Sequence, residues 1–186
     1  MLSLVVVLSL SGLIILSIIV IYNKLIRLKN TVQSSWSDVD VQLKKRYDLV
    51  PNLIETVKGY AAHEKSVFQN VTEARSRAMQ TSGPAEKALA ETQLQATLKT
   101  LFALAEAYPD LKANANFAQM QSQLQSLEDN IESARRYYNA VVRDYNILIE
   151  SFPSNLIASG FKFEKSDFFE LQSPETERQP VKVSFS

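Results

Sequence analysis

Histidine is the first residue type to consider for catalysis or metal binding, and this chain has one, His63. A helical metal site needs a second histidine or several carboxylates at helical spacing, whereas the adjacent Glu64 points about 100° away around a helix. The absence of cysteine excludes disulfides, thiolate nucleophiles and thiolate-bound zinc. No glycine-rich phosphate loop or Ser-His-Asp set can be assembled. We therefore expect His63 to be a surface residue, and we predict no catalytic, cofactor or metal site.

Asp38 and Asp40 could suggest a pair of catalytic carboxylates. Residues two apart in a helix do not face each other, however. Asp40 and Lys44 do face each other, and Lys44 and Asp48 repeat the relation in reverse order. This spacing favours a salt-bridged or solvated helix face, and the alternative is a face that binds a partner.

Arg46 is a polar residue inside an apolar stripe. If it is buried, it needs a carboxylate or several carbonyl groups, and the sequence offers Asp144 or Asp48 as candidates. Asn139 and Asn146 lie seven residues apart, beside the apolar stripe of a second helix. Polar residues at such positions usually fix the register of packed helices. A functional polar groove is the other interpretation.

The elements that carry these residues are predicted to be long helices. Apolar residues recur at steps of three, four or seven from Trp36 onward, which predicts an amphipathic helix over residues 36–64 that continues to about Met79. Pro51 falls inside it and favours a kink rather than a new start, because the stripe keeps its phase. Residues 81–84, Thr-Ser-Gly-Pro, predict a break.

Two further helices are predicted after this break. One spans residues 84–107, and Asp110 is the expected cap of the next. Residues 111–152 have a heptad pattern, which predicts antiparallel packing along the helix of residues 36–79. Pro153 should end that helix. The phenylalanine-rich segment that follows is expected to dock as an irregular cap or a last helical turn.

Residues 2–22 contain no charged side chain and are long enough to span a bilayer. No Lys or Arg precedes the apolar run and no small-x-small site follows it, which favours an uncleaved anchor over a signal peptide. Lys24, Arg27 and Lys29 follow at once. The positive-inside rule then predicts an N-terminus outside and the remaining chain in the cytoplasm.

Composition sets the broad class. The formal net charge is zero, so no overall field draws the chain to nucleic acid, and no nucleic-acid partner is expected. Few glycines and prolines and a helix-favouring middle predict an all-α protein, with an N-terminal transmembrane helix followed by an antiparallel bundle of long helices. The predicted divisions are an anchor at residues 1–23, a bundle at 24–170 and a flexible tail at 171–186.

Two blocks of sequence resemble the LemA family. The first runs through Tyr22–Leu25, Trp36–Arg46 and Asp48–Tyr60, and the second through Ala134–Asn139, Arg143–Asn146 and Ser151–Pro153. The resemblance covers nearly the whole chain, to about Glu170. It implies a single-pass protein of the bacterial inner membrane with a long-helix bundle and no established enzymatic activity. The residues to which it draws attention are Trp36, Asp38, Asp40, Lys44, Arg46, Asp48, Pro51, Asn52, Glu55, Gly59, Arg135, Tyr138, Asn139, Tyr145 and Asn146.

Three function classes follow. The first is a non-enzymatic membrane-anchored scaffold of the cell envelope, whose partners are the lipid bilayer, further copies of itself, or membrane proteins such as the metalloproteases beside which the family is often encoded. The second is a membrane-shaping or oligomer-forming protein, since the family includes a magnetosome membrane protein. The third is an enzyme that uses the Asp, Glu and Arg face, for which the sequence lacks a recognisable catalytic set.

Overall fold

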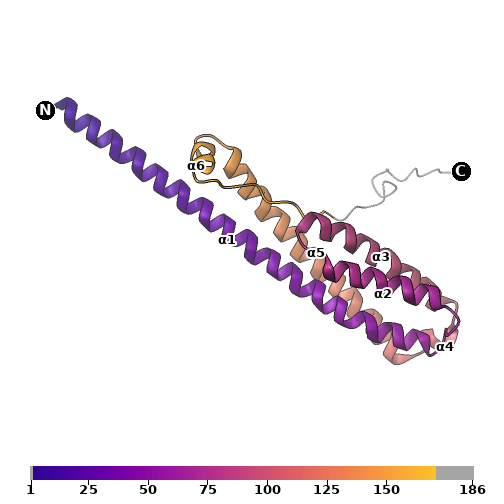
Figure 1. The fold of residues 1–186 in the computed structure, drawn as a ribbon. Helices are drawn as coiled ribbons and strands as arrows, with labels where there is room; N and C mark the ends of the chain where they lie inside the picture. The colour runs from indigo at the N-terminus through magenta and orange to yellow at the C-terminus, as the bar shows by residue number, and fades with distance from the viewer. Residues whose placement is uncertain (1, 171–186) are drawn as a thin grey trace, which may run out of the picture. The chain divides into compact units, whose positions relative to one another are not determined.

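The computed structural model describes residues 2–170, and Figure 1 shows their arrangement. Six helices follow one another: α1 (Leu2–Lys58), α2 (Lys65–Gln80), α3 (Pro84–Glu106), α4 (Pro109–Lys112), α5 (Ala115–Glu150) and α6 (Ser154–Gly160). The described residues contain no strand. The all-α prediction is therefore confirmed, with a long apolar helix at the N-terminus followed by further helices. The predicted flexible tail lies outside the described residues.

The chain forms two compact units. Of the described residues, unit 1 comprises 2–40 and 133–168, and unit 2 comprises 41–132 and 169–170. Helices α1 and α5 each contribute one part to unit 1 and one part to unit 2.

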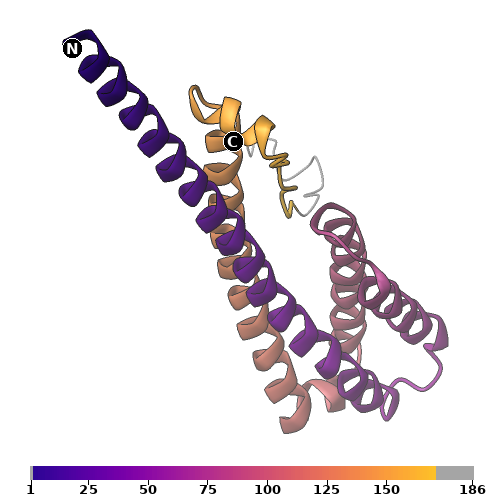
Figure 2. The same cartoon turned by 60° about the vertical axis from the view of Figure 1, so that its left-hand side comes forward.

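Unit 2 contains the C-terminal part of α1, the N-terminal part of α5, and the hairpin of α2 and α3. Helices α2 and α3 lie side by side (Figures 1 and 2). Gly83 has φ +85°, a conformation that glycine adopts without strain, and it leads directly into Pro84 at the start of α3. The predicted break at residues 81–84 is therefore confirmed. The apolar core includes Leu43, Val50, Leu53, Val57, Phe68, Val71, Leu94, Leu98, Leu101, Leu111 and Phe117.

The predicted continuation of the first helix to Met79 is wrong, because α1 ends at Lys58 and α2 begins at Lys65. The amides of Tyr60 and Ala61 both bond the carbonyl of Val57, at 3.0 and 2.9 Å, and close the end of α1. Ala61 is buried in the turn that follows. Because Ala61, Phe68 and Val71 continue the apolar spacing of α1, periodicity alone did not indicate the turn.

Helix α5 is confirmed, but it begins at Ala115 rather than at residue 111 and its cap differs from the prediction. The carboxamide Oδ1 of Asn114, not Asp110, accepts hydrogen bonds from the amides of Asn116 and Phe117, at 2.9 and 3.1 Å. The predicted partner, a helix of residues 36–79, does not exist as one helix. Within unit 2, α5 lies along α1, since Lys45 and Leu49 line a shared hollow with three residues of α5, namely Gln123, Ser126 and Leu127.

Unit 1 contains the N-terminal part of α1, the C-terminal part of α5, helix α6 and an extended segment, residues 163–168. The Trp36 and Tyr138 rings join α1 to α5, with centroids 5.2 Å apart. The Tyr22 ring contacts Phe161 and Phe163 at centroid distances of 4.8 and 5.9 Å. The expectation that the phenylalanine-rich segment docks through a last helical turn is met by α6, although Phe161 itself stays 58% exposed.

Candidate functional site

The first candidate site is a group of charged side chains and one tyrosine inside unit 2. We call it the polar cluster: Arg46, Tyr47, Arg75, Lys87, Glu91 and Glu128. Arg46 is 2% exposed and forms ion pairs with Glu91 of α3 and Glu128 of α5. The sequence-based candidates for its partner, Asp144 and Asp48, are wrong. Asp48 pairs with Lys44 at 2.9 Å, and Asp144 pairs with Arg143 at 3.0 Å, all on exposed side chains.

Glu91 is the centre of the polar cluster. Its side chain is 1% exposed, and besides Arg46 it accepts a hydrogen bond from the Tyr47 hydroxyl. The Lys87 ammonium lies 5.9 Å from the centre of the Tyr47 ring, within the range of a cation–π contact. A buried carboxylate is costly unless it is paired and hydrogen-bonded, and here a cation and a phenol meet that requirement.

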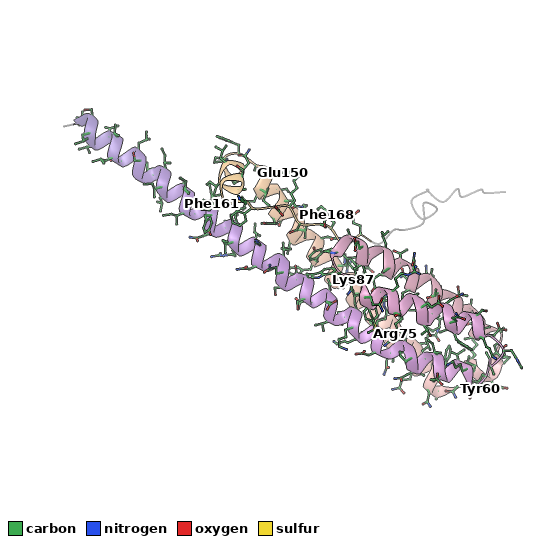
Figure 3. The ribbon with its side chains drawn as sticks, in the orientation of Figure 1. Tyr60, Arg75, Lys87, Glu150, Phe161 and Phe168 are labelled. Carbon is green, nitrogen blue, oxygen red and sulfur yellow. The ribbon has the colours of Figure 1, made fainter. Side chains whose placement is uncertain are left out.

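Pro51 explains the position of Arg75. A proline has no N–H, so in α1 the carbonyl of Tyr47, four residues earlier, loses its helical hydrogen-bond donor. The Nε of Arg75, on α2, donates to this carbonyl at 2.7 Å. Pro51 lies inside a continuous α1, so no new helix begins there, and the kink at Pro51 stays a prediction. Figure 3 labels Arg75 and Lys87 on the two helices that pack against this part of α1.

One hollow of about 320 Å³ adjoins the polar cluster between α3 and α5. Glu128 is the member that lines it, together with Lys99 and three glutamines, Gln95, Gln121 and Gln125. The Glu128 carboxylate is already bound to Arg46, and its side chain is 28% exposed. Within the polar cluster, the two carboxylates are used in ion pairs with Arg46, and Glu91 also accepts from the Tyr47 hydroxyl. Residues 2–170 contain no group of three or more His, Asp or Glu side chains that could hold a metal ion.

In unit 1, tyrosine and asparagine side chains fasten the extended segment to α5. The Tyr138 hydroxyl donates to the carbonyl of Asp167 at 2.8 Å. The Asn146 amide donates to the carbonyl of Ser166 at 2.9 Å, and its oxygen accepts from the Ser166 amide at 3.0 Å. Asn146 thus pairs with the backbone of Ser166 through both of its polar atoms, so these bonds hold a non-helical segment rather than a partner helix.

Burial changes the acidity of two tyrosines in unit 1. Desolvation, and after it the nearby Asp167 carboxylate, raise the pKa of Tyr138 to about 12. Desolvation, followed by the charge of Glu164, raises the pKa of Tyr145. Both effects favour the neutral phenol. Tyr138 is therefore suited to donating its hydrogen bond rather than to acting as a base.

A second candidate site is the outer face of α1 in unit 2. We call it the outer stripe: Val41, Lys44, Asp48, Asn52, Glu55 and Gly59. These residues recur at steps of three or four, so they share one side of the helix, and all are exposed. Lys44 and Asp48 form one surface ion pair on this face, and Glu55 forms another with Lys58. In unit 1, Asp38 and Asp40 are also exposed.

The structure separates the residues singled out from the sequence. The buried or half-buried residues are Trp36, Arg46, Pro51, Arg135, Tyr138, Asn139, Tyr145 and Asn146. The exposed residues are Asp38, Asp40, Lys44, Asp48, Asn52, Glu55 and Gly59. His63 is exposed, as expected. Sequence reasoning missed Glu91, although Glu91 and Lys87 continue the heptad spacing of Leu94 and Leu98 toward the start of α3. A charged residue at a core position was the available signal.

Comparison with known proteins supplies the family. The LemA family profile matches residues 35–185. Magnetosome protein MamQ 2 of Paramagnetospirillum magneticum is 25% identical, over 80% of this chain and 64% of its own length. Protein LemA of Metamycoplasma hominis is 27% identical, over 87% of this chain and 74% of its own length. The chain therefore spans somewhat less than two thirds of the MamQ protein that it matches. It belongs to the LemA family.

Proposed function

We propose that this protein is a non-enzymatic, membrane-anchored scaffold of the bacterial cell envelope that binds a partner through the outer stripe. The observation that carries this proposal is that one helix, α1, holds both the apolar segment and the outer stripe. The apolar part has a mean hydropathy of 3.1 over 18 residues. Its side chains are exposed, Val6 and Leu13 by 60% and 62%, as expected of residues that face lipid.

The outer stripe supports the binding role because the fold makes little use of it. The Lys44 and Asp48 side chains are 71% and 58% exposed, and a surface ion pair of this kind contributes at most about 1 kcal/mol. Asn52 lies between the two ion pairs of the stripe on the same face. A face of this kind, with charges of both signs and an exposed amide, suits a polar protein partner.

Site-specific photocrosslinking in cells tests the binding role. A photoreactive phenylalanine placed at Asn52 or Asp48 should give a discrete crosslinked product, which mass spectrometry can identify. The matched control is Gln69, which is exposed on α2 of the same unit. No product from either stripe position, or the same products from Gln69, would contradict the proposal.

We propose that the anchor lies in the inner membrane, with the N-terminus outside and the helical units in the cytoplasm. This orientation follows from the cluster of basic residues directly after the apolar segment. Protease added to spheroplasts should leave the helical part intact until the membrane is broken. Digestion from outside would reverse the assignment.

A self-assembling, membrane-shaping role is the second candidate function, because the MamQ proteins that this chain resembles are named as magnetosome proteins. In this case the partner at the outer stripe, or in the membrane, is a second copy of the chain. The crosslinking experiment separates the two candidates, since a product of twice the chain mass supports self-assembly. A product with a different protein supports the scaffold.

A further inference from the structure

The turn from α5 into α6 carries an uncharged, apolar surface. Residues 151–161, which we call the elbow, read Ser-Phe-Pro-Ser-Asn-Leu-Ile-Ala-Ser-Gly-Phe, and the charged Glu150 and Lys162 stand directly on either side. Three large side chains of the elbow are exposed: Phe152 by 80%, Leu156 by 63% and Phe161 by 58%. Such a cluster of exposed apolar residues in an uncharged segment calls for an apolar environment.

The elbow lies against the apolar part of α1, as both ribbon views show (Figures 1 and 2). A hollow of about 590 Å³ separates the two, lined on the α1 side by Leu10, Leu13, Ile14, Ser17, Ile18 and Ile21. On the other side it is lined by Pro153, Leu156, Ile157, Gly160 and Phe161. Figure 3 labels Phe161 beside α1. The residues that face the elbow are therefore those of the proposed membrane anchor.

We propose that the elbow is a second membrane-embedded element, which enters the bilayer beside the anchor and encloses lipid acyl chains in the hollow between them. This inference rests on the proposed anchoring by α1. If Leu10–Ile21 lie in hydrocarbon, residues that line the same hollow lie at the same depth. Leu10 and Ile21 differ by about 16 Å along the helix axis, so the hollow extends well past the headgroup region.

Most polar groups described in the elbow are bonded within the protein, whereas the Oδ1 of Asn155 is buried without a hydrogen-bond partner. In hydrocarbon, each backbone or hydroxyl donor must be bonded within the protein. The Ser154 hydroxyl donates to the carbonyl of Leu148 at 2.6 Å, and the Ser151 hydroxyl donates to the carbonyl of Ile147 at 2.7 Å. The Phe163 amide bonds the carbonyl of Ala158 at 2.9 Å. Pro153 has no N–H to satisfy.

The serine hydroxyls of the anchor are also hydrogen-bonded within the protein. The hydroxyls of Ser9, Ser11 and Ser17 each donate to the carbonyl four residues earlier, at 2.9 Å. The border of the elbow is also typical of a membrane interface, with Tyr22 against Phe161 and with Lys29 5.9 Å from the centre of the Phe163 ring. Aromatic and basic residues thus follow the apolar parts of both elements.

Fluorescence quenching in vesicles tests this proposal on the full chain. Because the chain has no cysteine, a single introduced cysteine can carry an environment-sensitive NBD label at Leu156→Cys or at Phe152→Cys. The vesicles are phosphatidylcholine, with and without nitroxide-labelled acyl chains. Leu13→Cys is the control in the anchor. Asp38→Cys is the control in water, about 24 Å beyond Tyr22 along α1.

We expect blue-shifted emission at both elbow positions and nitroxide quenching of at least half the extent seen at Leu13. If Leu13 is quenched and the elbow labels behave like the label at Asp38, the elbow lies in water and the inference is wrong. Blue-shifted emission without quenching would mean that protein covers the elbow, which also overturns it. An unquenched label at Leu13 would instead refute the anchor, and the inference with it.

Discussion

At the scale of single residues, the polar cluster shows how a break in one helix is repaired by another. Pro51 deprives the Tyr47 carbonyl of its donor, and Arg75 supplies a replacement from α2. A buried carbonyl left without a donor costs about 1–3 kcal/mol. The position of Arg75 therefore depends on the presence of a proline at residue 51.

A double-mutant cycle tests this dependence. Arg75→Met should lower the free energy of unfolding by about 1–3 kcal/mol in the natural chain, because the Tyr47 carbonyl loses its donor. In the Pro51→Ala background the loss should be smaller, since the substituted residue has an amide that can donate to that carbonyl. Chemical denaturation in mild detergent measures both values. Arg77→Met is the matched control on α2, where Arg77 bonds Gln93 and should show no coupling to residue 51. Equal losses in the two backgrounds would contradict the explanation.

Glu91 should be the most costly residue of the polar cluster to remove. Glu91→Ala leaves buried Arg46 with one carboxylate and leaves the Tyr47 hydroxyl without its acceptor. We expect a loss of about 3–5 kcal/mol in the free energy of unfolding, as is found when one partner of a buried ion pair is removed. Asp48→Ala breaks an exposed pair and should cost less than about 1 kcal/mol. Similar losses for the two variants would show that the polar cluster contributes no more than a surface pair.

At the scale of elements, the helices were predictable where the sequence contains its own stop signals. Gly83 and Pro84 marked the start of α3, and Pro153 marked the end of α5. The turn between α1 and α2 was not predictable, because Ala61 and Phe68 preserve the apolar spacing of the helix before it. Gly59 was the one local cue, and a single glycine lowers helix stability without ending a helix.

The extended segment of residues 163–168 depends on tertiary contacts that no local pattern reports. Its backbone is bonded by Tyr138 and Asn146 of α5, which the sequence singled out but could not connect to Asp167 or Ser166. The spacing of seven residues predicted a position beside the helix interface. It could not distinguish a helix partner from an extended chain.

The Tyr138 contact predicts a dependence on alkaline pH. Its pKa is raised from 10.0 to about 12 in the folded state, so between these values the unfolded state loses a proton that the folded state keeps. Stability contributed by Tyr138 is therefore complete below about pH 10 and falls as the pH rises toward 12. The difference in unfolding free energy between the natural chain and Tyr138→Phe should shrink over this range, by circular dichroism in detergent. A difference that stays constant with pH would show that the Tyr138 phenol does not titrate differently on folding.

At the scale of the whole molecule, the family, the all-α class and the apolar N-terminal segment could all be predicted from the sequence. The polar cluster could not, because its members come from four helices and their spacing in the chain gives no sign of their contact. Arg46 was expected to need a carboxylate, yet Glu91 and Glu128 became its partners only through the packing of α3 and α5 against α1. Arg46 therefore belongs to the interior, whereas the outer stripe on the opposite side of α1 stays exposed.

Under the proposed function, α1 has to be held in a membrane for its outer stripe to meet the partner. The most direct measurement is photocrosslinking from Asn52 in cells, comparing the full chain with a chain that lacks residues 2–22 at equal abundance. We predict that the crosslinked product forms with the full chain and is lost with the shortened one, while circular dichroism of the shortened chain still reports helix. The same product at the same yield from the shortened chain would contradict the account.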